Sequence, residues 1–339
     1  MKWFRYLTAA LLTAFLLAAP ACAAFQDVAE DHWAYESISL AAERGLIQGM
    51  TANTFGLGQK VTRAQYATML CRLMDWTLVS PETGSFSDNQ DKSAWYYSAV
   101  ETAYLHGALL RIGDRCDANE PLSREEMAAM SVRALGYGAA FAGVVQDDCH
   151  FEDVTTNPGY IALAYRMGIM NGVSAHRFSP KDASTREQAA AVLLRVYDRL
   201  HATITVLSGQ PSGDTVAVRS LTGSDAELPL SPRAPLESVY DAAIAANGGA
   251  VAINALPYAQ SIRNGTVTNQ GILSAEALHA MLGDENTQLG RSARYQSSYL
   301  RHPEEDGSIT VVWYETDADI AVKVDLCRLM GVQTAYILR

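Results

Sequence analysis

Arginine recurs at one position in three short stretches that each resemble the start of a helix. The stretches read VTRAQ at 61–65, LSREE at 122–126 and STREQ at 184–188. In each, a Ser or Thr precedes a Gln or Glu by three residues, the capping box that satisfies free amides at a helix N-terminus. The arginines are Arg63, Arg124 and Arg186. Each falls at the first helical position, where a cation opposes the helix dipole at a cost of about 0.3–1 kcal/mol. Because arginine captures carboxylates and phosphates in a bidentate way, and helix N-termini attract anions, the pattern predicts three anion sites.

Two further residue types recur near these arginines. An aspartate lies upstream of each arginine, and a tryptophan follows two of the aspartates: the residues are Asp27, Asp88, Asp153, Trp33 and Trp95. An aromatic face beside a cation is what a sugar-binding groove requires, since the ring stacks on the apolar face of the sugar. Two plainer interpretations stay open. Each aspartate could neutralise one arginine inside the fold, and the tryptophans could be core anchors.

The arginines mark a repeat of about sixty residues. They lie 61 and 62 residues apart, and Phe25, Phe86 and Phe151 precede them. Apolar residues at helical spacing predict a first helix within residues 35–49, 96–110 and 160–172. Gly45, Gly107 and Gly168 stand where a left-handed residue would end such a helix. Each unit is therefore predicted to be a helix, a loop and a second helix that begins at the arginine.

One such unit cannot bury its apolar face alone, but three can share a core. The fold class predicted is α+β multidomain: an all-α, pseudo-threefold assembly of three helical hairpins, followed by a small α/β domain. Residues 77–85 and 139–150 read as linkers by composition.

Composition and the N-terminus define the compartment. The chain has 339 residues and a net charge of −11, without a basic run, so nucleic acid is not an expected partner. Residues 1–24 combine Lys2 and Arg5, an apolar run and small residues, which is typical of a secretory signal peptide. Lipidation at Cys22 is an alternative, although its flanking residues form a poor attachment box. No other stretch is apolar enough to predict a membrane helix, so export without a membrane partner is expected.

The remaining cysteines predict no metal site. None of them forms a CxxC pair, and no zinc, P-loop, EF-hand or other metal or cofactor motif occurs. Cys71 lies within a helical pattern and is expected to be a buried apolar group. Export permits a disulfide, and Cys116 and Cys149 in loop-like sequence are the candidate pair.

The repeat as a whole resembles a known family. Phe-x-Asp-Val, Trp-Ala, a glycine-ended helix, a loop phenylalanine and [ITV]-T-R-x-[EQ] together resemble the S-layer homology (SLH) domain. The resemblance implies SLH repeats at 25–80, 86–140 and 151–200. It further implies that the exported protein is anchored non-covalently to the bacterial cell wall or surface layer. The partner it implies is secondary cell-wall polysaccharide, often carrying ketal-linked pyruvate, or peptidoglycan. The ligand-binding residues that it implies are Arg63, Arg124, Arg186, Trp33, Trp95, Asp27, Asp88 and Asp153.

Two units depart from this pattern. The second lacks counterparts of Gly49 and Phe55, and the third has only Tyr160 as a weaker match to the tryptophan. Not every groove is therefore expected to be active.

Residues 201–339 read as α/β sequence. Strands are predicted in ATITVLSG, TVAVRSL, AVAINALPY, SITVVWY and VQTAYIL, and helices in LESVYDAAIAANGG, SAEALHAML and TDADIAVKVDLCRLMG. The last helix, capped by Thr316 or Asp317 and ended by Gly331, is predicted to join the two strands around it as a parallel crossover.

This region resembles the last third of a family 18 glycoside hydrolase barrel, on INALPY at 253–258 and on residues 298–332. The acidic DxxDxDxE cluster of that family is missing, and Leu338 stands where the family usually has a tryptophan. Glu315 near a strand end cannot supply both required carboxylates. No catalytic residue is therefore predicted, and the region is expected not to be an enzyme. The alternatives are a wall-targeted hydrolase of peptidoglycan or chitin-like glycan, and a minor lattice protein of the surface layer.

Overall fold

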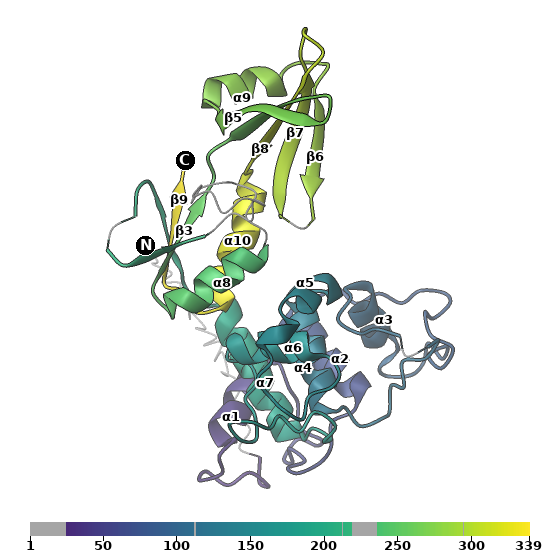
Figure 1. Ribbon diagram of the computed structural model, residues 1–339. Helices are drawn as coiled ribbons and strands as arrows, with labels where there is room; N and C mark the ends of the chain where they lie inside the picture. The colour runs from purple at the N-terminus through teal and green to yellow at the C-terminus, as the bar shows by residue number, and fades with distance from the viewer. Residues whose placement is uncertain (1–24, 112, 212, 219–235, 294) are drawn as a thin grey trace, which may run out of the picture.

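The computed structural model describes residues 25–111, 113–211, 213–218, 236–293 and 295–339, so the predicted signal peptide and Cys22 lie outside the described residues. The chain forms a helical region and, beyond it, a region with two sheets (Figure 1). Among the described helices, none is long and apolar enough to cross a membrane.

Six helices make up the three units of the helical region. They are α1 (Tyr35–Glu43), α2 (Arg63–Leu73), α3 (Tyr97–Leu105), α4 (Arg124–Ala134), α6 (Pro158–Arg166) and α7 (Arg186–Leu200). The second helix of each unit begins at the predicted arginine, and all three predicted capping boxes are formed. The three predicted helix-ending glycines adopt positive φ angles of 69° to 72°. These local predictions are confirmed.

Helix pairing differs from the predicted hairpins. The two helices of one unit do not form the main pairs; instead α3 packs on α2, α6 on α4, and α1 on α7. Each first helix therefore packs on the second helix of the preceding unit, in cyclic order. The apolar stripe of each first helix has to be covered by another helix. Because the loop inside each unit is long, a helix of a neighbouring unit can cover it.

Backbone hydrogen bonds join the three units in a ring just before the arginines. The amide of Val61 donates to Ser184 O at 3.0 Å, Leu122 to Val61 O at 2.9 Å, and Ser184 to Leu122 O at 2.8 Å. The side chains of Val61 and Leu122 are fully buried at this ring. The cycle runs from the first unit to the third, from the third to the second and from the second back to the first, so the helical region is closed rather than an open solenoid.

The stretch predicted as a linker at 139–150 is instead structured. It forms α5 (Ala139–Val144) and the short 3₁₀ helix η1 (Gln146–Asp148), and α5 packs on α6 and on α8 (Leu236–Ala246). The ring of Phe141 meets that of Tyr240 edge to face, with centroids 6.1 Å apart. The prediction was wrong because apolar Ala, Val and Phe in this stretch gain burial against the following region. Residues 77–85 contain no helix or strand, as predicted.

The C-terminal region contains one parallel and one antiparallel sheet. The parallel sheet has the order β1-β9-β3-β2, from β1 (Thr205–Ser208), β2 (Thr215–Ala217), β3 (Ala250–Asn254) and β9 (Thr334–Leu338). The antiparallel sheet has the order β5-β4-β8-β7-β6, from β4 (Tyr258–Arg263), β5 (Thr266–Ile272), β6 (Gln288–Ser292), β7 (Ser297–Pro303) and β8 (Ile309–Tyr314). The remaining helices are α9 (Ala275–Leu282) and α10 (Asp317–Leu329).

The predicted crossover around α10 is wrong. β8 pairs antiparallel with β4 and β7, whereas β9 pairs parallel with β1 and β3, so α10 links two different sheets. A turn at Gly307, with φ of 82°, folds β8 back on β7 as a hairpin and takes β8 out of the parallel sheet. The sequence alone did not show this because both strands are equally apolar.

One arginine joins the two regions. α7 packs on α10, and Nη1 of Arg328 donates to the carbonyl oxygens of Arg199, at 2.6 Å, and Leu200 at the end of α7. These carbonyls have no partner within their own helix, because the last turn of a helix leaves its acceptors free. The C-terminal region is therefore attached directly to the end of the third unit.

Candidate functional site

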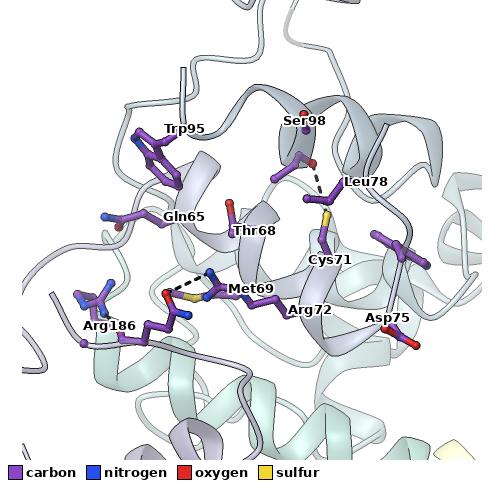
Figure 2. A pocket seen from close by; sticks show the side chains of 14 residues that line it. Gln65, Thr68, Met69, Cys71, Arg72, Asp75, Leu78, Trp95, Ser98 and Arg186 are labelled. Atoms are coloured by element: carbon purple, nitrogen blue, oxygen red, sulfur yellow. Dashed lines mark hydrogen bonds between the residues drawn. The ribbon is translucent and has the colours of Figure 1, made fainter. Parts of the chain in front are cut away.

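Three grooves open on the helical region, and each is lined by one predicted arginine. Groove A, with a volume of 530 Å³, lies between α2, Arg186 and Trp95 (Figure 2). Groove B, of 250 Å³, lies between α4, Arg63 and Asn157. Groove C, of 180 Å³, lies between α7, Arg124 and Trp33.

Each groove draws on all three units. Its floor is the second helix of one unit, its arginine comes from the preceding unit in the cycle, and its outer residue comes from the following unit. Trp33 therefore lies with Arg124 and Trp95 with Arg186, whereas Arg63 has no tryptophan. In the sequence, each tryptophan stands in the same repeat as one arginine. In the ring, each tryptophan instead lies in a groove with the arginine of another unit.

Both tryptophans are exposed. Trp33 is 62% and Trp95 is 64% accessible, so neither anchors the core. In the third unit Tyr160, the weaker sequence match, is only 5% accessible and accepts a hydrogen bond from Nε of Arg133 at 2.9 Å. Asn157 occupies the outer position in groove B, so this groove offers a ligand no aromatic face there.

Arg186 and Arg124 hold neighbouring loops through carbonyl oxygens. Nε and Nη2 of Arg186 donate to Phe55 O at 3.0 Å and Gln48 O at 2.6 Å. The same atoms of Arg124 donate to Phe178 O and Asn171 O, both at 2.9 Å. Each guanidinium also lies over the phenylalanine ring, 5.0 Å and 4.8 Å from its centroid.

The positive charge of these two arginines is not cancelled by a carboxylate in contact. Within the described ranges neither forms an ion pair, and their bonds to the loops do not use Nη1. Burial lowers the pKa of both guanidinium groups from its ordinary value, and nearby acids partly offset this effect. Since arginine stays protonated in proteins, each groove keeps a cation with unused donors.

Arg63 differs because it is neutralised. Its Nε donates to Glu126 Oε1 at 3.0 Å, its Nη2 contacts the same oxygen, and the side chains are 13% and 25% accessible. Burial raises the pKa of Glu126, but hydrogen bonds from Ser123 and Arg63 outweigh it and hold that pKa below the ordinary 4.5. Units one and three carry Gln65 and Gln188 at this capping position, so only groove B contains this carboxylate.

A glycine difference explains why the arginines behave differently. A Cβ on Gly49 would come within 2.6 Å of the Phe25 ring, and one on Gly172 within 2.4 Å of the Phe151 ring. These glycines let the loop close on the phenylalanine, and the preceding carbonyls, of Gln48 and Asn171, are those that Arg186 and Arg124 bind. The second unit has Arg111 there, and Arg63 bonds Glu126 instead.

The three predicted aspartates are placed away from the grooves. Their carboxylates accept backbone N–H groups of their own unit's loop, at 2.7–3.1 Å for Asp27, 2.9 Å for Asp88 and 2.8 Å for Asp153. None of them is among the residues that line grooves A, B and C. They fix the loops that the arginines bind, so the geometry supports a structural role.

These aspartates predict acid sensitivity of the helical region. Slight burial raises each pKa, but the backbone hydrogen bonds outweigh it and leave the pKa below the ordinary 3.8. The stabilisation is therefore fully present above the unfolded value and is lost as pH falls through the lower folded value. Circular dichroism melts should show a constant melting temperature from pH 7 to 5 and a fall below pH 4. The variant with Asn at all three positions should melt lower at pH 7 with a weaker fall, and equal acid dependence would contradict this origin.

The helix N-termini do not themselves offer an anion site. The amides of Arg63, Arg124 and Arg186 donate to Glu120 O, Asp182 O and Gln59 O, at 2.9–3.1 Å. The third amide of each helix donates to the capping hydroxyl. The predicted contribution of the helix ends is therefore corrected: the first amide of each helix bonds a neighbouring unit and the third bonds the capping hydroxyl of its own unit, so neither is free for a ligand.

Sequence reasoning missed a second set of arginines. Arg72, Arg133 and Arg195 lie nine residues after the first set and line grooves A, B and C in turn. Arg72 donates to Gln48 Oε1 at 3.3 Å and Arg195 to Ile169 O at 3.2 Å. The equal spacing in all three units was the available signal, and it doubles the positive charge in grooves A and C.

The candidate disulfide between Cys116 and Cys149 is not formed. Cys116 and Cys149 are both free thiols, as are the buried Cys71 and Cys327. Cys116 is fully buried, and burial raises the pKa of its thiol to about 12. It occupies the core position of Phe55 and Phe178 in the other units, where Asp88 binds its amide. Its role is therefore packing.

Two carboxylates of the C-terminal region, those of Glu315 and Asp319, have internal partners. Glu315 is buried against Lys323 and accepts from Ser297 Oγ at 2.6 Å, and burial raises its pKa to about 7. Asp319 is fully buried, accepts from Arg291 at 2.7 Å and caps α10 through Thr316. Neither carboxylate is available to an external sugar in this arrangement.

Comparison with known protein families finds a match in the helical region. The S-layer homology domain model matches residues 24–67 and 150–190. The first and third units of the helical region are therefore similar to S-layer homology domains.

Several curated proteins are similar to somewhat more than half of this chain. The amylopullulanase of Thermoanaerobacterium thermosulfurigenes is 32% identical over 183 residues, covering 52% of this chain and 10% of that protein. The exoglucanase XynX of Acetivibrio thermocellus is 31% identical, covering 52% and 16%. The S-layer protein of Bacillus thuringiensis subsp. finitimus is 27% identical over 201 residues, covering 57% and 24%. The match thus spans less than a quarter of each relative's length.

Among solved structures, the Bacillus cereus spore cortex-lytic enzyme SleL gives a TM-score of 0.30 at 12% identity, over 65% of this chain and 60% of that one. The chitinase of Chromobacterium violaceum ATCC 12472 gives 0.29 at 15% identity, over 63% and 70%. Such scores fall short of a shared fold.

Proposed function

We propose that residues 25–200 anchor the exported protein to the bacterial cell wall by binding an anionic, pyruvylated secondary cell-wall polysaccharide in grooves A and C. One observation carries the proposal. In each of these grooves an exposed tryptophan from one unit lies across from an arginine of another unit that has no ion-pair partner among the described residues. We further propose that residues 86–140 are a diverged third SLH repeat, since they complete the ring.

The chemistry of the two grooves is complementary to such a sugar. The apolar face of a pyranose ring stacks on the indole of Trp33 or Trp95. A pyruvyl carboxylate then accepts hydrogen bonds from the unused Nη1 of Arg124 or Arg186. Charge-assisted bonds of this kind are roughly twice as strong as neutral ones. Arg195 or Arg72 adds a second cation in the same groove.

Co-sedimentation with purified Gram-positive cell walls tests the proposal. The mature protein, residues 25–339, should pellet with walls that retain acid-labile pyruvate and should remain in the supernatant after mild acid treatment of the walls. Equal pelleting with both preparations would show that the pyruvyl carboxylate is not what the protein binds.

Groove B should contribute little to glycan binding. One substitution tests whether the neutralisation of Arg63 is the reason. Changing Glu126→Gln gives the second unit the capping residue of the other two units and removes the carboxylate that neutralises Arg63. We expect glycan affinity to rise by about two- to fivefold, since an exposed or half-exposed charge pair is worth about 0.2–1 kcal/mol. Isothermal titration calorimetry measures this affinity. Gln65→Glu is the matched control variant, and it should weaken glycan binding in groove A. An unchanged affinity in both variants would contradict the electrostatic explanation.

We propose that residues 201–339 have no glycosidase activity. The support is the sequestration of Glu315 and Asp319, together with the absence of the family 18 acidic cluster from the sequence. Zymography on peptidoglycan and on a chitin oligomer should show no clearing. A clear zone that is lost in Glu315→Gln would instead favour the wall-targeted hydrolase.

A further inference from the structure

Groove A is larger than its two counterparts. Asp75, Trp76 and Leu78, which follow α2, line its far end, and its volume of 530 Å³ lies within the range of about 300–1,000 Å³ usual for ligand sites. Grooves B and C, of 250 and 180 Å³, fall below that range. Figure 2 shows Trp95 and Arg186 at one end of the groove and Asp75 and Leu78 at the other.

The backbone after α2 is shaped to build this extension. Asp75 adopts a left-handed conformation, with φ of 51°, and the amide of Trp76 donates to Cys71 O at 3.0 Å. This is the pattern that reverses a chain at a helix end. The imidazole of His106 then stacks on Trp76, with ring centroids 4.2 Å apart and planes 3° apart. One indole face is thereby covered, and the half-buried ring, which also packs on the core, presents its remaining surface to groove A.

The other two units lack such an extension. The counterpart of Trp76 in the second unit is Tyr137, which is buried with 6% accessibility. In the third unit α7 continues to Leu200, and Arg199 at this position lies against Gly168 and Gly331. Two tryptophans in one groove are therefore a property of groove A among the three.

From this geometry we infer that groove A binds two successive sugar residues, whereas groove C binds one. This inference rests on the proposed wall-glycan function. The pyruvylated sugar lies at the Trp95 end, where Arg186 and Arg72 provide positive charge. The neighbouring sugar stacks on Trp76 and is uncharged, because the Asp75 carboxylate repels an anion and accepts hydrogen bonds from hydroxyl groups. Thr68 and Ser98 line the groove between the two ends.

Calorimetry with two defined probes tests the inference. The monosaccharide probe is the methyl glycoside of a 4,6-pyruvate-ketal hexose, and the disaccharide probe extends it by one neutral N-acetylhexosamine. The protein is the mature chain carrying Trp33→Ala, which removes the aromatic platform of groove C. In this background the disaccharide should bind about tenfold more tightly than the monosaccharide. Trp76→Ala should remove that gain, so that the two probes bind with equal affinity, and Trp76→Phe should restore most of it.

Each outcome separates the inference from the function on which it rests. Equal affinity for the two probes, or a gain that survives Trp76→Ala, overturns the two-sugar site and leaves the anchoring function intact. Binding of neither probe overturns both. Near-ultraviolet circular dichroism checks that Trp76→Ala stays folded. Saturation-transfer NMR on the protein with Trp76 intact gives an independent measure, since the protons of the second sugar should be saturated as strongly as those of the first.

Discussion

Replacing Trp33 and Trp95 together by alanine should release the protein from cell walls, with a loss of affinity of about 100-fold or more. Each ring is more than 60% accessible and is the outer wall of one groove, so its removal takes away the stacking face without disturbing the core. Stacking of a nucleic-acid base on an aromatic side chain contributes roughly 1–3 kcal/mol, and we expect a similar contribution from a sugar stacked on each indole. Two grooves on one chain also bind a polymer together, which multiplies their individual affinities. Co-sedimentation across a range of wall concentrations measures the loss.

The matched control replaces two other exposed apolar residues by alanine. Leu105 and Leu289 are 65% and 63% accessible and line none of the three grooves. The control should pellet as the unmodified protein does. Each single tryptophan variant should lose less than the double variant, because one groove remains. If the double variant pelleted as well as the control, the grooves would not be the adhesive surface.

Arg186→Ala should destabilise the helical region by roughly 3–5 kcal/mol, because the buried carbonyl of Phe55 and the part-buried carbonyl of Gln48 lose their donor, and each such loss costs about 1–3 kcal/mol. Arg186 is only 4% accessible and connects the third unit to the loop of the first through Phe55 O and Gln48 O. The substitution also removes the contact between the guanidinium group and the Phe55 ring. For a domain of this size the melting temperature should fall by about 10 °C. Differential scanning calorimetry measures the shift.

Arg177→Ala is the control for this change. Arg177 is exposed, and its ion pair with Asp153 at 3.8 Å lies at the surface, where pairs contribute about 0–1 kcal/mol. Its melting temperature should change by no more than about 3 °C. A similarly small shift for Arg186→Ala would contradict the closing role of the buried guanidinium. Loss of wall binding in an arginine variant therefore has to be compared with its stability, whereas the tryptophan variants report on binding directly.

The local features of the helical units could be predicted because neighbouring residues determine them. A capping box needs only a hydroxyl and a Gln or Glu three residues on, and Gly45 ends its helix through its own backbone freedom. The arginine that recurs in the sequence of the three units does line one groove in each case. Its partners, however, come from another unit, up to 138 residues away for Arg186 and Gln48, and no periodicity within a unit encodes such a pairing.

Strand pairing and linkers show the same limit. The segments β8 and β9 were found as strands, but the sheet to which each belongs depends on hairpin closure with β7. Residues 139–150 have the composition of a linker, yet they form α5, which packs on α6 and α8 and buries Ala142. In both places the contact that decides the structure lies outside the segment itself.

The sequence by itself determined that three capped helices each begin with an arginine, since capping chemistry acts within four residues. Only the tertiary structure decided that these arginines bind the loops of neighbouring units and that Glu126 neutralises the charge of Arg63. It also decided that Trp33 and Trp95 line grooves whose floors are helices of other units. The physical reason is that a ring of three units satisfies each helix start and covers each apolar face with groups from the next unit. The site is therefore formed between repeats that are far apart in the chain.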